Sequence, residues 1–372
     1  MQSKNEMLII ARARVIAYYL PQFHPIPEND EWWGKGFTEW TNVGKAKPLF
    51  KGHNQPRIPS DLGYYDLRMP EIREAQAELA RNAGIEGFMY WHYWFGNGRT
   101  LLERPFAEVL KSRKPDFPFC LGWANHSWSN HEWNPDTQWN RKSSLIVQTY
   151  PGKEDNENHF FSVLEAFVDK RYITIDDKPA FLIYNPLGIT NANELINSWN
   201  NLAIKNGLKG IHFIGLVPSL KNDIIKLGFD AMNKGGQWVA ESTIKGRIRR
   251  ILYDKINAYI GGIKLDCYDY KEIIKYMFND EDKNENVYPT ILSQWDRSPR
   301  SGRRAVIYTN SNPDYFKIHV NQALDIIEHK EYQHKILFLK SWNEWAEGNY
   351  VEPDLLYGHG YLDTLRDVIK IK

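Results

Sequence analysis

The sequence predicts an α/β protein of the (β/α)8 class, also called the TIM barrel. Eight short β-branched and aromatic runs recur along the 372 residues, and most are continuous rather than alternating. Continuous apolar runs are typical of parallel strands that are buried on both faces. Amphipathic stretches with helix start and stop signals lie between several of these runs. Eight strands alternating with helices is the pattern of a single barrel, which commonly has this length or less.

The individual elements follow in order along the chain. The predicted strands are 14–20, 85–94, 118–124, 179–185, 210–217, 229–233, 289–295 and 335–342. The predicted helices are 70–84, 156–171, 191–207, 312–330 and 360–372. The first of these has a proline in its first turn and a glycine at its end, as helices often do.

One barrel domain is therefore expected over residues 14–372, after an N-terminal extension at 1–13. The segment at about 234–288 is long for a single connection, and we interpret it as an elaborated loop rather than a second domain. Within it, residues 242–260 are predicted to form a basic amphipathic helix, whose polar face more often meets solvent than a membrane.

Composition excludes several classes of protein. The 47 basic residues balance 46 acidic ones, whereas a nucleic-acid partner normally requires a basic face. The two cysteines, Cys120 and Cys267, lie far apart, so neither a disulfide framework nor a CxxC metal site is expected. The 14 Trp and 21 Tyr exceed what a core of this size needs, and their rings are suited to ligand contacts.

The N-terminus contains only a short apolar patch, "MLIIA", which is shorter than the core of a signal peptide. No run approaches the ~20 apolar residues of a membrane span. We therefore expect a cytoplasmic protein if this start is the natural one, and a periplasmic or secreted protein if an export signal was removed.

Aromatic and amide residues gather at the predicted C-terminal ends of the strands, where barrels of this class carry their active sites. Indole rings stack on the C–H faces of sugars, while amides and imidazoles bond their hydroxyls, so this end predicts a carbohydrate site. For one tryptophan taken alone, core packing is the more common role. The candidate substrate-binding residues are Tyr18, Tyr19, Trp40, Tyr90, His92, Trp94, Trp123, Asn125, His126, Trp128, Tyr184, Trp295, Trp342 and Asn343.

Carboxylates occur in the same places. Glu344 and Glu347 follow the last strand in "SWNEWAEG", and glycoside chemistry needs two such groups. A pair of glutamates three apart is usually a solvated helix face, but here it lies among tryptophans at a strand end. Asp296 and Glu39 are further acidic candidates. Because strand one lies beside strand eight, Glu39 is predicted to approach the same cleft; bracing of its long loop is the equal alternative.

Other chemistries lack their motifs. The chain contains no GxSxG elbow, P-loop or GxGxxG. His92, His126 and His131 show no HExxH or His-x-His spacing, so neither a metal nor a cofactor is expected. No DxD motif of the kind that nucleotide-sugar transferases use occurs at a predicted strand end.

Four long blocks, 17–70, 87–105, 119–128 and 338–354, closely resemble the WbsX-type domain, a group described as polysaccharide glycosyltransferases. The resemblance extends over about residues 14–370. That group is similar to glycoside hydrolase family 99, the endo-α-1,2-mannosidases and mannanases, which are metal-independent (β/α)8 barrels. The resemblance thus implies the same fold and a polysaccharide or oligosaccharide substrate.

The resemblance also implies roles for two residues. In family 99 two catalytic glutamates lie three apart after the last strand, and these positions correspond to Glu344 and Glu347. The first is a base that deprotonates the sugar's 2-hydroxyl, which attacks C1; the second protonates the leaving oxygen and then activates water. A retaining endo-glycoside hydrolase is therefore expected. The alternatives are a glycosyltransferase or transglycosylase of surface polysaccharide assembly, and a non-catalytic carbohydrate-binding barrel.

Overall fold

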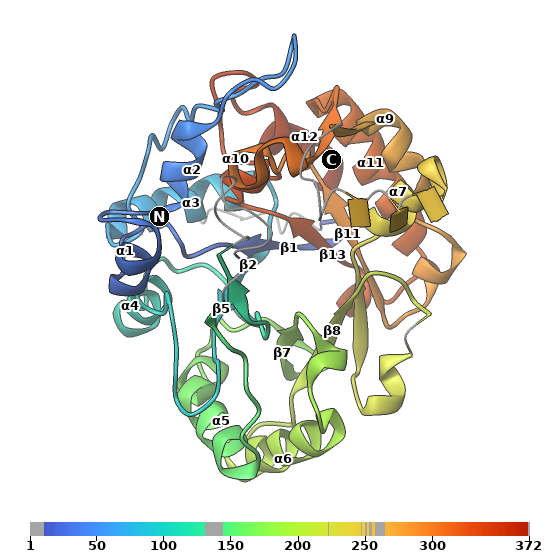
Figure 1. Cartoon of the computed structure of the whole chain (residues 1–372). Helices are drawn as coiled ribbons and strands as arrows, with labels where there is room; N and C mark the ends of the chain where they lie inside the picture. The colour runs from blue at the N-terminus through green and yellow to red at the C-terminus, as the bar shows by residue number, and fades with distance from the viewer. Residues whose placement is uncertain are drawn as a thin grey trace, which may run out of the picture.

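The structure is a computed structural model that describes residues 11–130, 144–221, 223–246, 248–249, 251–252, 255–256 and 265–370. Figure 1 looks along a central barrel of strands with helices arranged around it. In the described residues, eight parallel strands form the ring in the order β3-β2-β1-β13-β11-β9-β8-β7, and pairing of β3 with β7 closes it. The predicted (β/α)8 class is confirmed.

The barrel strands all lie within a few residues of their predicted positions. They are β1 (Arg14–Tyr19), β2 (Gly87–His92), β3 (Phe119–Trp123), β7 (Lys178–Ile183), β8 (His212–Val217), β9 (Ala231–Lys234), β11 (Val287–Leu292) and β13 (Ile336–Lys340). Their side chains are almost entirely buried, as the continuous apolar runs require. Trp295 was predicted to end the seventh strand but lies beyond it, in the loop that follows.

Helices cover the outside of the ring (Figure 1). The longer ones are α3 (Pro70–Asn82), α4 (Arg104–Ser112), α5 (Lys153–Phe167), α6 (Ala192–Lys205), α7 (Gln237–Lys245), α11 (Pro313–Ile327) and α12 (Gly360–Ile369). Helix α4 was not predicted. Pro70 begins α3, and Gly84 follows its end with a φ of +84°, as the sequence signals indicated.

The loops beyond the strands' C-terminal ends carry short elements of their own. The first loop contains α1 (Pro27–Trp33) and α2 (Glu39–Lys45), and the loop after β3 contains the antiparallel pair β4 (Trp128–Ser129) and β5 (Ser144–Ile146). A two-residue strand, β6 (Thr174–Ile175), pairs antiparallel with the start of β7. Among the described residues, no helix is long and apolar enough to cross a bilayer.

The segment 234–288 contains more regular structure than the predicted loop. It holds α7, β10 (Asp266–Asp269) and α9 (Tyr270–Ile273), and β10 pairs in parallel with β12 (Val306–Thr309) from the loop after β11. Tyr268, Trp295 and Tyr308 belong to a separate apolar cluster there. That cluster ties the two loops together. The predicted basic helix over 242–260 lies partly outside the described residues, and α7 ends within it at Lys245.

Candidate active site

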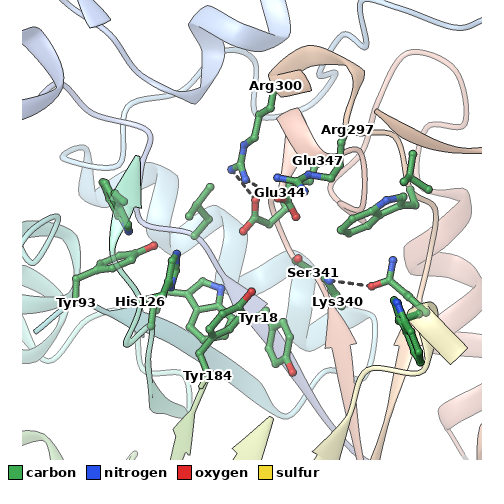
Figure 2. A pocket seen from close by; sticks show the side chains of 18 of the residues that line it. Tyr18, Tyr93, His126, Tyr184, Arg297, Arg300, Lys340, Ser341, Glu344 and Glu347 are labelled. Carbon is green, nitrogen blue, oxygen red and sulfur yellow. Dashed lines mark hydrogen bonds and ion pairs between the residues drawn. The ribbon is translucent and has the colours of Figure 1, made fainter. Parts of the chain in front are cut away.

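A cavity of about 660 Å³ opens at the C-terminal ends of the barrel strands. Its wall combines aromatic rings with charged side chains, as Figure 2 shows. It is lined by Tyr18, Leu20, Trp91, Tyr93, Ala124, His126, Trp128, Tyr184, Gln237, Trp238, Glu241, Trp295, Arg297, Arg300, Val306, Lys340, Ser341, Glu344 and Glu347. The size and the mixture of rings and polar groups are those of a small-molecule or sugar site.

The two glutamates of the cavity belong to a tight turn after β13. Trp342 and Trp345 point into the core and are 0 and 1% exposed, while Glu344 and Glu347 face the cavity. The Trp345 indole donates to the Glu352 carboxylate at 2.6 Å, which anchors the turn. Asn343 bonds both the N–H and the C=O of Leu20, at 2.8 and 3.0 Å, and so joins the turn to the end of β1.

Arg300 organises the carboxylates of the site. It lies on α10 (Ser298–Ser301) in the loop after β11 and is buried. Its Nη1 donates to Glu347 at 2.8 Å, and its Nη2 donates to Glu344 at 2.9 Å and to Glu39 at 3.0 Å. Figure 2 shows the guanidinium reaching Glu344 and Glu347 from one side. One cation thus neutralises part of the charge of three buried carboxyl groups. Without it, burying these charges would cost much free energy.

The surroundings shift the pKa values of the pair in opposite directions. Burial, together with the nearby charges of Glu347 and Glu39, raises the pKa of Glu344 to about 8 despite Arg300. Burial also raises the pKa of Glu347, but Arg297, Arg300 and Lys340 outweigh it and lower the value to about 2. At neutral pH the pair therefore holds one proton. One protonated and one ionised carboxyl is the combination that general acid and base catalysis requires.

Two more cations border the pair. Arg297 Nε lies 3.3 Å from a Glu347 oxygen, and Lys340 ends β13 beneath the turn. Lys340 Nζ lies 4.3 Å from the centre of the Trp295 ring and donates to Gln237 Oε1 at 2.8 Å. Burial lowers the pKa of Lys340, while Glu347 and Glu344 raise it.

Glu39 lies behind Arg300 and does not line the cavity. Its side chain is fully buried, and burial raises its pKa although Arg300 opposes the shift. The predicted approach of Glu39 to the glutamates is thus through a shared guanidinium rather than through the cavity. Its position allows an electrostatic effect on the pair but no contact with a molecule in the cavity.

A Glu39→Gln variant is expected to move the alkaline limb of the pH–rate profile to lower pH. The substitution removes a like charge that raises the pKa of Glu344, so that pKa falls. The positive charge of Arg300 is then shared by two carboxylates instead of three, which lowers the pKa of Glu344 further. The profile of kcat/KM measures the shift. If only thermal stability changes and the limb stays in place, Glu39 serves only to brace its loop.

Some of the sequence candidates come together in the cavity. They are Tyr18, His126, Trp128, Tyr184, Trp295, Glu344 and Glu347. Tyr184 is 41% exposed, whereas Trp128 and Trp295 are largely buried and present only part of their surface. Burial lowers the pKa of His126, so its imidazole is neutral and able both to donate and to accept hydrogen bonds.

The structure places other aromatic candidates in the core, and several of them contact the helices around the barrel. Tyr19, Tyr90, Trp94, Trp123 and Trp342 are buried. The Trp94 indole donates to Asp155 at 3.1 Å and the Trp123 indole to the Trp94 carbonyl at 2.8 Å. Trp40 is partly buried, and its indole donates to the carbonyl of Tyr65 at 2.7 Å. None of these residues lines the cavity.

The remaining polar candidates are also engaged elsewhere. His92 Nε2 lies 2.9 Å from Nε2 of His159, and Asn125 bridges to the backbone of Asn185. Asp296 accepts from His53 at 2.8 Å and from Gln55 at 2.7 Å. The two bonds to Asp296 join the loop after β1, which contains His53 and Gln55, to the loop that carries Arg297 and Arg300. Asn343 has the bridging role described above.

Sequence reasoning missed several lining residues, above all Arg297, Arg300 and Lys340. A signal existed for the arginines, since "RSPR" directly follows Asp296 at a predicted strand end. Two carboxyl groups buried close together are stabilised by nearby cations or by a shared proton. Nothing in the sequence distinguishes Lys340, the last residue of an apolar strand.

Within the described parts of the chain, no group of three or more His, Cys, Asp or Glu side chains is arranged to hold a metal ion. His131, one of the three histidines considered from the sequence, lies outside the described residues.

Paired carboxylates beside aromatic rings at the C-terminal mouth of a (β/α)8 barrel are an arrangement that many carbohydrate-active enzymes share. The comparison with family models matches residues 15–365 to the family described as "Glycosyltransferase WbsX", and the chain belongs to that family. The resemblance seen in the sequence is thereby confirmed.

Two curated relatives match most of the chain. Two proteins of Xanthomonas campestris pv. campestris, from strains B100 and ATCC 33913, are each described as "Uncharacterized protein WxcX". Both are 32% identical over 360 residues, which is 96% of this chain and 50% of theirs. The chain thus spans about half the length of these curated relatives.

The fold is similar to that of the GH99 endo-alpha-mannosidase from Bacteroides thetaiotaomicron, with a TM-score of 0.57 and 15% identity over 95% of each chain. A structure described as "Glycoside hydrolase-like protein" has a TM-score of 0.60 and 16% identity, covering 97% of this chain and 94% of its own. At these identities the likeness establishes the fold.

Proposed function

We propose that the chain is a retaining endo-glycoside hydrolase that cleaves a bacterial polysaccharide, with Glu344 and Glu347 as its catalytic pair. One observation carries the proposal: two buried carboxyl groups face one cavity from a single turn, and their pKa values are shifted in opposite directions. Such a pair can give a proton to a leaving oxygen and take one from a nucleophile in the same site.

The roles within the pair follow from the resemblance to family 99. Glu344 as base removes the proton of the 2-hydroxyl, whose oxygen attacks C1 while the C1–O bond to the leaving sugar breaks. Glu347 protonates that leaving oxygen. In the second step Glu347 takes a proton from water, which opens the 1,2-anhydro sugar at C1, and Glu344 returns the proton to O2. The anomeric configuration is retained after two displacements.

The electrostatics of the free site favour the reverse distribution, because the raised pKa places the proton on Glu344 and the lowered one leaves Glu347 ionised. A glycosyl fluoride distinguishes the two assignments, since fluoride departs with little help from an acid. On this substrate, loss of the general acid should have a much smaller effect on the first step than loss of the base. The glutamine variant whose rate recovers on the glycosyl fluoride is the one that lacks the general acid.

Activity should be constant on the acid side of neutrality and fall as the pH rises through about 8. The working state needs one proton on the pair: Glu344 holds it below about 8, and Glu347 stays ionised down to about 2. The profile of kcat/KM tests this, because it reports the free enzyme. A decline between pH 5 and 7 with the fold intact would contradict the proposal.

A glycosyltransferase is the second candidate, favoured by the description of the family. In that reaction the same carboxyl groups would pass the glycosyl unit to a sugar hydroxyl instead of water. Candidate polysaccharides incubated with and without nucleotide sugars separate the two. Oligosaccharide products without any donor support hydrolysis, and chain extension that depends on the donor supports transfer.

Treatment with EDTA is expected to leave the activity unchanged. The pair supplies both protonation states without a metal, and the described residues provide no cluster of metal-ligating side chains. Turnover before and after dialysis against the chelator is the measurement. Complete loss, restored by a divalent cation, would favour the transferase.

A further inference from the structure

A second cavity, of about 350 Å³, lies over the ends of β7, β8 and β9. It adjoins the first cavity, because Tyr184, Gln237, Trp238 and Lys340 line both. In Figure 2, Tyr184 and Lys340 mark this side of the site, away from Arg300. A polymer bound across the catalytic pair therefore has a place to continue at the Tyr184 side.

The second cavity differs from the first in its chemistry. Its far wall consists of Pro186, Leu187, Leu216, Val217 and Pro218, and no Asp or Glu is among the described residues that line it. Leu187 is 56% exposed and Trp238 is 38% exposed. Large apolar side chains exposed together at a cavity mark a surface that binds an apolar group.

Some polar groups of the second cavity already have partners within the protein. Gln237 Oε1 accepts from Lys340, and both the backbone N–H and C=O of Asn185 bond the side chain of Asn125. A sugar hydroxyl that entered the apolar end would lose its bonds to water without replacing them, which is unfavourable. A methyl group at the same position would instead gain from burial.

We propose that the second cavity holds a sugar unit of the polymer beyond the reacting one and selects a unit that carries a methyl-bearing substituent. The substituent is either the methyl group of a 6-deoxy sugar or that of an acetyl group. This inference rests on the proposed function, since it requires a glycan in the catalytic cavity. It names a deoxy or acetylated polysaccharide as the substrate class.

Gly235 provides a way to block this cavity alone. It lines the second cavity but not the first, and a Cβ built on it meets open space. Its φ lies outside the range that side chains avoid, so a larger residue is tolerated without backbone strain. Gly44, an exposed residue near the end of α2, meets open space in the same way and provides a matched control.

The test measures binding of two matched pairs of probes to the intact chain by ligand-observed NMR. The first pair is methyl 6-deoxy-α-D-mannoside and methyl α-D-mannoside; the second is the methyl α-glycosides of N-acetylglucosamine and glucose. In at least one pair the methyl-bearing probe should bind about fourfold more tightly, the effect of burying one methyl group. The pair that responds identifies the source of the methyl group. Equal affinity within both pairs overturns the inference.

Gly235→Leu should abolish this preference, and Gly44→Leu should leave it unchanged. A preference that survives Gly235→Leu, with the melting temperature unaltered, would place the methyl group elsewhere and overturn the inference. Because binding is measured without turnover, the two proposals fail separately. If the chain hydrolyses a polysaccharide but shows no methyl preference, only this inference is wrong. If Gly235→Leu blocks a methyl preference but the chain cleaves no polysaccharide, only the proposed hydrolase activity is wrong.

Discussion

Glu344→Gln and Glu347→Gln should each lower turnover by at least ~100-fold on a good substrate, the usual contribution of general acid–base catalysis. Glutamine keeps the shape and a hydrogen-bond acceptor for Arg300, but it neither holds the negative charge nor transfers a proton. The measurement is kcat, with circular dichroism to show that the fold is retained.

Glu328→Gln makes the same chemical change on an exposed residue and should leave turnover unaltered. A near-normal rate in either active-site variant would remove that residue from the mechanism. The double variant should lose little more than the worse single one, as is usual for catalytic residues that act as a unit.

Arg300→Met should have the second large effect, on stability as well as activity. The substitution keeps an unbranched chain but removes the guanidinium that bonds Glu39, Glu344 and Glu347. Removing one partner of a buried ion pair typically destabilises a protein by about 3–5 kcal/mol, since it leaves an uncompensated charge. Urea unfolding measures the change, and the pH–rate profile of any remaining activity should show a higher pKa for Glu347.

A second substitution tests the cause. In the Arg300→Met background, Glu39→Gln removes one of the unpaired carboxyl groups and should restore part of the stability. Arg366→Met, at an exposed arginine that pairs with Asp363 on the surface, should change stability by less than about 1 kcal/mol. Equal effects of the two arginine substitutions would contradict the role given to Arg300.

The fold was predictable because its signal is repeated. Eight apolar runs each report a strand buried on both faces, so a shift of a few residues in any one run leaves the class unchanged. The two-stranded sheet of β10 and β12 was not predictable, because it joins segments about 40 residues apart and each strand has only four residues. Its short runs resemble any loop with a few apolar residues.

The site was predictable in part for a physical reason. Residues that face the cavity and residues that face the core alternate at the strand ends, and both kinds are aromatic. Trp342 and Glu344 are two positions apart, yet one is fully buried and the other lines the cavity. The positions of the aromatic residues in the sequence locate the correct end of the barrel. Only the direction of each side chain separates the residues that line the cavity from those that pack in the core. Arg300 depends on contacts across 44 to 261 positions of sequence, which no local pattern contains.

The bonds from Asn343 to Leu20 have a consequence for the order of folding. They span 323 positions and join the turn that carries the glutamates to the first strand of the barrel. The turn can therefore reach its working geometry only after the first and last strands of the barrel have paired, and contacts across so many residues are typical of slow folding. Loss of activity should accordingly be among the first signs that the seam between first and last strands has opened.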